Sequence, residues 1–183
     1  KTIYYMSYIV KTALIGDYSV GKSSIVSRFT KDIFPTFDIS TLGVDFDCKL
    51  MDFKENNYKI QIWDTAGQEK FQSIVKSYIR DVNVCILVCD VNNYQSFTNL
   101  KKWLEEILFI TDNENLVFQI VGNKNDLNKN LRQIPLEEIE EFCRTQNIDY
   151  MECSAKNNDN INQIFINVIE KINDLVLSNK IKL

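Results

Sequence analysis

The segment from Gly16 to Ser23 has the residue types and the spacing of a phosphate-binding loop. It reads GDYSVGKS, which matches the pattern G-x-x-x-x-G-K-[S/T], and it lies between an apolar run and a stretch with helical spacing. Backbone N–H groups of such a loop surround phosphate oxygens, and the helix that follows contributes a favourable dipole. The segment therefore predicts a binding site for a nucleoside triphosphate.

Two side chains of this loop have expected roles of their own. Lys22 would reach the β- and γ-phosphates, and the Ser23 hydroxyl would bind Mg²⁺. The other residues of the loop that we expect to contact the phosphates are Ser19, Val20, Gly21 and Ser24. The loop leaves the identity of the base open.

Two later segments favour guanine over adenine. Residues 123–126 read NKND after an apolar run, and residues 154–156 read SAK after the next predicted strand. A carboxylate at Asp126 could accept hydrogen bonds from N1–H and the 2-amino group of guanine, whereas adenine would leave this acid unpaired. The residues expected to hold the base are Asn123, Lys124, Asp126, Ser154, Ala155 and Lys156. An ATPase is the alternative, and it would not depend on Asp126 for its choice of base.

The segment DTAGQE at residues 64–69 and an earlier threonine are expected to sense the γ-phosphate. Asp64 would hold Mg²⁺ through water, the Gly67 N–H would reach a γ-phosphate oxygen, and Gln68 would orient the attacking water. Thr41 would close over Mg²⁺ and the γ-phosphate. Catalysis by Gln68 and Lys22 would rest on positioning and charge neutralisation, without a covalent nucleophile. Both loops are expected to relax when the γ-phosphate leaves.

Strand-like and helix-like stretches alternate along the chain. The predicted strands are Ile9–Ile15, Asp45–Phe53, Tyr58–Trp63, Val84–Cys89, Val117–Val121 and Tyr150–Ser154, of which the second and third form an antiparallel hairpin. Helical spacing covers Lys22–Thr30, a stripe of Phe97, Leu100, Leu104, Ile107 and Leu108, a segment with Pro135 as its first residue, and Ile161–Ile172. This order predicts one α/β domain over residues 1–183, with a mostly parallel six-stranded sheet, one antiparallel edge strand and helices on both faces. The motifs follow strands, at whose carboxyl ends such sheets bind ligands.

Composition excludes several classes of function. The chain of 183 residues carries a net charge of −4, which argues against a nucleic-acid binder. No apolar run approaches the roughly 20 residues that span a bilayer. Histidine is absent, which removes Ser-His-Asp and Cys-His catalysis, and the five cysteines include no C-x-x-C pair and are expected to be reduced.

With these motifs in place, residues 8–178 resemble the small GTPases of the Ras superfamily, and the Rab family is the most similar branch. The stretches that carry the resemblance are LGVDF, KIQIW, KFQSIV, SYIRD and LVCDV, in that order. The resemblance implies a P-loop NTPase G domain that acts as a GTP/GDP switch with Mg²⁺ in vesicle traffic. It also implies that Phe46, Trp63 and Tyr78 contact effectors and that Phe34 packs edgewise on guanine.

The same resemblance implies partners and a location. An exchange factor, a GTPase-activating protein that supplies an arginine, effectors and a prenyl-binding chaperone would act on a monomer. A Rab works in the cytoplasm, on the cytosolic face of an endomembrane, where a prenylated tail holds it. The chain ends in SNKIKL without a cysteine after Cys153, so we expect such a tail to lie beyond Leu183.

Tyr18 departs from the pattern, because Ras carries glycine at this position of the loop. We expect the ring to crowd Gln68 or the arginine of an activating protein, and so to slow hydrolysis. A slow or GTP-locked effector-binding scaffold of the Rab type is therefore an alternative to a working switch. A Ran-like transport GTPase is another, since Ran shares TLGV and DTAGQEKF, although SYIRD and LVCDV favour Rab.

Overall fold

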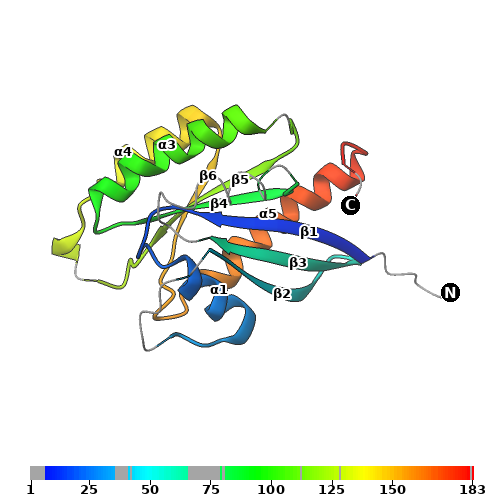
Figure 1. Ribbon diagram of the computed structural model, residues 1–183, viewed down its shortest axis with the longest axis horizontal. Helices are drawn as coiled ribbons and strands as arrows, with labels where there is room; N and C mark the ends of the chain where they lie inside the picture. Colours follow the sequence, from blue (N-terminus) through cyan, green and yellow to red (C-terminus); the bar gives the residue numbers. More distant parts are fainter. Residues whose placement is uncertain are drawn as a thin grey trace.

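The computed structural model describes residues 7–35, 41, 43–65, 79, 81–111, 113–127, 129–181 and 183. Within these ranges, six strands form one sheet in the order β2-β3-β1-β4-β5-β6 (Figure 1). Their bounds are β1 Ser7–Ile15, β2 Val44–Phe53, β3 Asn56–Thr65, β4 Val84–Asp90, β5 Val117–Asn123 and β6 Asp149–Glu152. β2 and β3 run antiparallel, and every other neighbouring pair is parallel. The predicted sheet with one antiparallel edge strand is confirmed.

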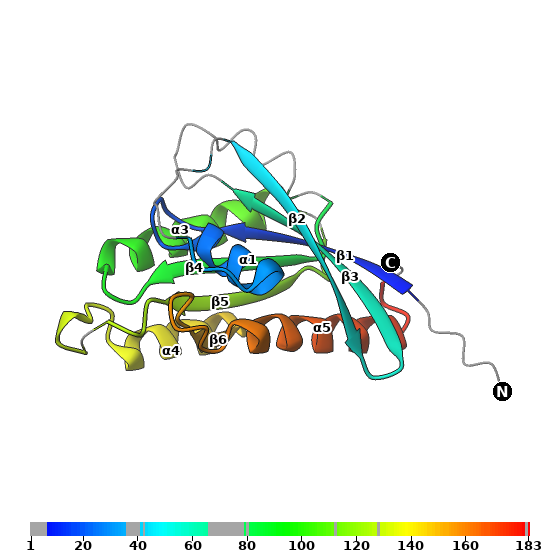
Figure 2. The same ribbon diagram turned by 90° about the horizontal axis from the view of Figure 1, so that it is seen from below.

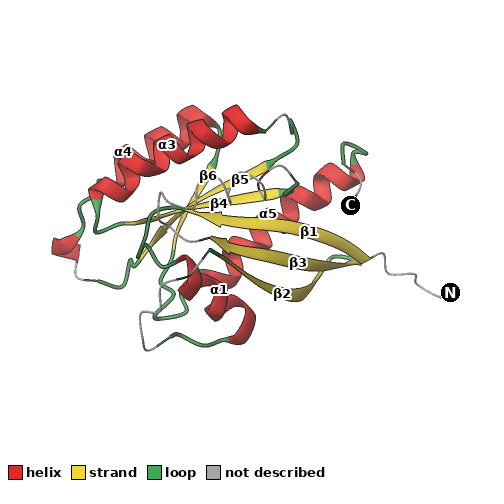
Figure 3. Cartoon of the chain, in the orientation of Figure 1, coloured by secondary structure: helices red, strands yellow, loops and turns green. Residues whose placement is uncertain are grey.

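Helices cover both faces of this sheet, as predicted. Their bounds are α1 Lys22–Lys31, α3 Tyr94–Ile110, α4 Leu136–Gln146 and α5 Ile161–Leu177, with a short 3₁₀ turn, η2, at Lys129–Leu131. α3 and α4 lie on one face and α1 and α5 on the other, which is clear when Figure 1 is compared with Figure 2. Figure 3 shows the central strands between the two helical layers, with β2 at an open edge of the sheet. The central strands are therefore buried on both faces, which explains the continuous apolar runs of β4 and β5.

Each face of the sheet has its own apolar core. On the side of α1 and α5, the Phe29 ring stacks on the Phe165 ring with 3.6 Å between centroids. On the side of α3 and α4, four members of the predicted α3 stripe are buried: Phe97, Leu100, Leu104 and Ile107. The fifth member, Leu108, is exposed and lines a surface hollow together with Leu116, Phe118 and Leu175.

Several predicted boundaries differ from the observed ones by one or two residues, and two of these differences have a clear cause. Pro135 is the N-cap of α4 rather than its first residue: its ψ of 134° is extended, and its carbonyl accepts the N–H groups of Glu138 and Ile139. The last strand ends at Glu152 rather than Ser154, because Ser154 instead forms a two-way backbone bridge with Asp159. This bridge closes a turn just beyond the carboxyl end of β6, so the SAK segment lies in a loop.

Four loops leave the carboxyl ends of neighbouring parallel strands. They follow β1, β4, β5 and β6, and β3 ends beside β1 at the same edge. Since these strands are adjacent and parallel, the loops meet at one edge of the sheet. Of the helices in the described part of the chain, none is both long and apolar enough to span a bilayer.

Candidate functional site

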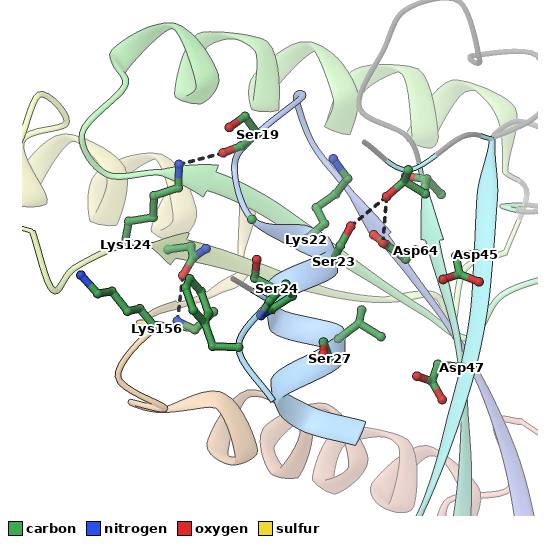
Figure 4. Close-up of a pocket in the computed structure, with 18 of the residues that line it drawn as sticks. Ser19, Lys22, Ser23, Ser24, Ser27, Asp45, Asp47, Asp64, Lys124 and Lys156 are labelled. Carbon is green, nitrogen blue, oxygen red and sulfur yellow. Dashed lines mark hydrogen bonds between the residues drawn. The ribbon is translucent and has the colours of Figure 1, made fainter. Parts of the chain in front are cut away.

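A cleft of about 740 Å³ lies at the edge where these loops meet (Figure 4). Most of the residues predicted from the motifs line it: Ser19, Gly21, Lys22, Ser23, Ser24, Phe34, Thr41, Asp64, Asn123, Lys124, Asp126, Ala155 and Lys156. Val20 and Ser154 are buried directly behind this lining. Gly67, Gln68 and Tyr78 lie outside the described residues. Segments far apart in the sequence thus contribute to one cleft.

The backbone of the phosphate loop approaches other chain segments too closely for side chains at two positions. A Cβ on Gly21 would lie 2.2 Å from Nδ2 of Asn123, and Gly21 has a φ of 96°. A Cβ on Gly16 would lie 2.2 Å from the carbonyl oxygen of Val88, at a φ of 150°. Glycine is required at both positions by space and by conformation. The motif's two glycines therefore fix the shape of the loop between β1 and α1.

Lys22 begins α1 and is buried within the loop. Its Nζ donates hydrogen bonds of 2.8 Å to the carbonyl oxygens of Gly16 and Asp17. Burial lowers the pKa of Lys22 to about 8, while the charges of Asp64 and Asp17 partly oppose this shift. The loop thus surrounds a cation whose charge is incompletely compensated by protein groups, a suitable arrangement for an anionic ligand.

A contact that the motif did not predict anchors the loop to α3. The Asp17 carboxylate accepts hydrogen bonds from Nδ2 of Asn99 at 2.7 Å and from Nε1 of Trp103 at 3.1 Å. Asn99 and Trp103 are four residues apart on a helix and therefore share one face. In the sequence, the four-residue spacing shows that Asn99 and Trp103 share a helix face, but it does not identify Asp17 as their partner. The first turn of the loop is held by α3 as well as by its own backbone.

The side chains of Ser23, Thr41 and Asp64 form a cluster of oxygen atoms in the lining of the cleft. The hydroxyl oxygens of Ser23 and Thr41 are 2.8 Å apart, and the Thr41 hydroxyl donates to Oδ2 of Asp64 at 3.3 Å. Asp64 is only 4% exposed, and its Oδ1 has no hydrogen-bond partner among the described residues. Burial raises the pKa of this carboxyl.

This cluster fits a hard divalent cation. Two hydroxyls and a carboxylate supply oxygen donors only, which are the ligands that Mg²⁺ takes, alongside waters and phosphate oxygens. The unpaired Oδ1 of buried Asp64 is a donor atom that a cation or its bound water would satisfy. Ser23, Thr41 and Asp64 are the three residues that the sequence assigned to the metal.

Asn123 connects the phosphate loop to the loop after β6. Its Nδ2 donates to the Val20 carbonyl at 2.9 Å, and its Oδ1 accepts from the Ala155 N–H at 3.2 Å and from the Cys153 thiol at 3.4 Å. The side chain is 2% exposed, so these bonds are shielded from water. The neighbouring Lys124 donates from Nζ to the Ser19 carbonyl at 2.7 Å, a bond visible in Figure 4.

Asp126 lines the same cleft as the oxygen cluster. Its Oδ1 accepts a 2.6 Å hydrogen bond from the Ser154 hydroxyl, which in turn accepts the N–H of Asn157. This arrangement orients the carboxylate while Asp126 still lines the cleft. The partly exposed Phe34 ring lines the same cleft. An oriented carboxylate and an aromatic ring suit a flat ligand with paired N–H donors, such as guanine.

Two predicted aromatic side chains lie side by side on β2 and β3. Phe46 and Trp63 are register partners, and their rings meet edge to face with 5.4 Å between centroids. Phe46 is 49% exposed, whereas Trp63 also packs against the core beside α3. Tyr18, at the mouth of the cleft, is 54% exposed.

Comparison with known proteins agrees with this geometry. A model of the Ras family matches residues 11–174. The chain is similar to the Ras-related protein RABD2a of Arabidopsis thaliana, with 42% identity over 172 residues that cover 93% of this chain and 83% of the relative. It is similar to the Ras-related protein Rab-30 of Homo sapiens, with 41% identity over 161 residues that cover 88% and 78%. It is also similar to the GTP-binding protein YPTM2 of Zea mays, with 42% identity over 172 residues that cover 93% and 83%.

The lowered pKa of Lys22 predicts proton uptake when a phosphate binds. The folded-state pKa of about 8 lies below the ordinary 10.5, so between these values the stability of the unliganded protein rises with pH. A bound phosphate favours the charged amine and raises the pKa of Lys22. Affinity for a nucleoside diphosphate should therefore fall as the pH rises above about 8, approaching about tenfold per pH unit.

Isothermal titration in two buffers of different ionisation enthalpy measures this proton uptake. Near pH 9 we expect the protein to take up a fraction of a proton for each nucleotide bound. Near pH 6.5 we expect none from Lys22, because its amine is charged both with and without nucleotide. Equal heats in the two buffers at the higher pH would contradict the assignment of Lys22 to the phosphates.

Proposed function

Because this chain belongs to the Ras family and is a Rab-like small GTPase, a hydrolase of GTP, we propose that its cleft binds guanine nucleotide with Mg²⁺ and that the chain is a GTP/GDP switch in membrane traffic. Members of this family bind GTP and GDP, typically with Mg²⁺, and act through regulators and effectors. The observation that carries the proposal is that one cleft combines the phosphate loop with the oriented carboxylate of Asp126.

The phosphates belong, in this proposal, in the loop from Ser19 to Ser24. Lys22 exchanges its bonds to the Gly16 and Asp17 carbonyls for phosphate oxygens, which compensate its buried charge fully. The dipole at the start of α1 adds to this attraction. The proposal is supported by the burial of Lys22 and by the fixed shape of the loop around it.

Ser23, Thr41 and Asp64 are the proposed residues for Mg²⁺, with Asp64 acting through water. When bound, the ion would neutralise charge that develops on the phosphates during hydrolysis. Thr41 is in contact with both Ser23 and Asp64. It therefore links the segment before β2 to the phosphate end of the cleft, and the loss of a γ-phosphate would weaken that link.

Guanine is the proposed base because Asp126 and its neighbours present matching acceptors. Asn123, Lys124, Ser154, Ala155 and Lys156 are the further residues proposed to hold the base, and Phe34 would pack against the edge of the ring. An adenine base would leave Asp126 without its paired donors. The hydrogen bond from Ser154 supports this role, because it orients the carboxylate at the lining of the cleft.

Hydrolysis in this proposal needs no covalent nucleophile from the protein. Gln68 orients water and Gly67 contacts the γ-phosphate; both stay predictions, because they lie outside the described residues. Lys22 neutralises charge, and an arginine from an activating protein would add about 10³–10⁵ in rate.

Effectors are proposed to bind across β2 and β3, in the GTP state. The exposed Phe46 ring and its contact with Trp63 support this surface, which Tyr78 would complete. A role in membrane traffic follows from the Rab relatives, and an exchange factor, an activating protein and a prenyl-binding chaperone are the regulators that this role requires.

Replacement of Asp126 tests the choice of base. Asp126→Asn exchanges an acceptor for a donor, so GDP affinity should fall at least about 100-fold and preference should move toward xanthosine diphosphate. Competition between the two nucleotides for the variant measures this shift. Asp45→Asn, which removes a carboxylate beside Asp64 in the same cleft, is the matched control and should keep the preference for GDP. An unchanged preference in Asp126→Asn would favour the ATPase alternative.

Replacement of Tyr18, at the mouth of the cleft, tests the alternative that the protein is a slow or GTP-locked switch. We expect wild-type hydrolysis at or below roughly 10⁻⁴ s⁻¹ without an activating protein, and a faster rate for Tyr18→Gly, because the ring then no longer crowds Gln68. Single-turnover hydrolysis of preloaded GTP gives both rates. Tyr18→Phe keeps the ring and should remain slow. Equal rates for the wild type and Tyr18→Gly would show that the ring does not limit hydrolysis.

A further inference from the structure

The guanidinium of Arg28 on α1 joins the loop after β6 to the end of its own helix. Nε donates to the Ala155 carbonyl at 3.0 Å, and one terminal nitrogen donates to the Lys156 carbonyl at 3.2 Å. The other terminal nitrogen donates to the Asp32 carbonyl at 2.9 Å and to its carboxylate at 3.3 Å. All three nitrogens of the group are therefore engaged, and the side chain is only 15% exposed.

Ala155 is held from two directions by this arrangement. Its N–H is bound by Asn123, and its carbonyl is bound by Arg28, whose position lies 127 residues earlier in the chain. Arg28 thereby extends the connection that begins at the phosphate loop, through Asn123 and Ala155, to the end of α1.

Asp32 is the point where the chain leaves α1 toward Phe34. It caps the helix in the left-handed conformation, with a φ of 56°, and its carboxylate also accepts from Nδ2 of Asn158 at 3.0 Å. Arg28 and Asn158 thus fix this residue against the loop after β6. Phe34 follows two residues later and lines the same cleft as Ala155 and Lys156 of that loop.

We infer that Arg28 is a positioning residue that keeps the base end of the cleft closed and so slows the release of guanine nucleotide. This inference rests on the proposed function. Arg28 does not line the cleft, so it acts through Ala155 and Lys156 on one side and the Asp32–Phe34 segment on the other. The phosphate end keeps its own anchors, Asp17 and Lys22, which Arg28 does not contact.

The shape of the guanidinium matters as well as its charge. Three of its four acceptors are neutral carbonyl oxygens, at three different residues, and the one carboxylate is exposed. A planar fork reaches these acceptors at once, whereas a lysine ammonium at the end of a flexible chain does not reproduce that geometry. Arg28→Lys is therefore expected to lose most of the effect despite keeping the charge.

Two rates measured on the same preparations test this inference. Release of fluorescently labelled GDP into excess unlabelled GDP should be about tenfold faster or more in Arg28→Ala, and faster in Arg28→Lys than in the wild type. Single-turnover hydrolysis of preloaded GTP should stay within about twofold, because the phosphate end is untouched. Arg144→Ala, which removes an exposed arginine paired with Glu141 on α4, is the matched control and should change neither rate.

The outcomes separate a positioning role from a merely structural one. Faster GDP release with preserved hydrolysis supports the inference. Unchanged release in Arg28→Ala, or release from Arg28→Lys at the wild-type rate, overturns it while leaving the proposed function intact. A parallel loss of hydrolysis would indicate general loosening of the fold and also overturns it. If the wild-type protein retains no GDP, the proposed function fails, and this inference fails with it.

Discussion

The buried side-chain amide of Asn123 is the interaction on which the two halves of the cleft depend. Its amide group bonds the phosphate loop at Val20 on one side and the loop after β6 at Ala155 on the other. Because the amide is shielded from water, loss of either partner would leave a buried polar group unsatisfied, which costs about 1–3 kcal/mol. The phosphate loop and the loop after β6 therefore hold one another in place. A glycine at position 21 is the condition for this contact, since a Cβ there would collide with the amide.

The other contacts around the cleft fall into two groups. In one group, Asp17, Lys22, Lys124 and Arg28 bond to a side chain of α3 or to loop carbonyls, and these contacts tie the loops around the cleft to one another. Thr41 belongs to the other group, because its contacts with described residues run through its hydroxyl, to Ser23 and Asp64. A switch of the family's kind needs this division: a frame that keeps the nucleotide and a segment whose position depends on the γ-phosphate.

The sequence predicted the parts of the site that depend on backbone geometry. Gly16, Gly21 and the strand-loop-helix order specify a phosphate loop at the end of β1, and parallel strands then bring the loops after β5 and β6 to the same edge. Asp126 was predicted from base chemistry. The contacts of Asp17 with Trp103 and of Arg28 with Ala155 were not predicted, because they join residues 86 and 127 positions apart. Their donors are ordinary helical side chains, and only the packed structure brings them to their acceptors.

The central claim is that this cleft selects guanine nucleotide and retains it through that frame. The most direct measurement is the identity of the nucleotide released when freshly purified protein is denatured and the supernatant is separated by anion exchange. Guanine nucleotide is expected in an amount close to that of the protein. Adenine nucleotide, or no nucleotide from a folded preparation that also fails to take up added GDP, would contradict it.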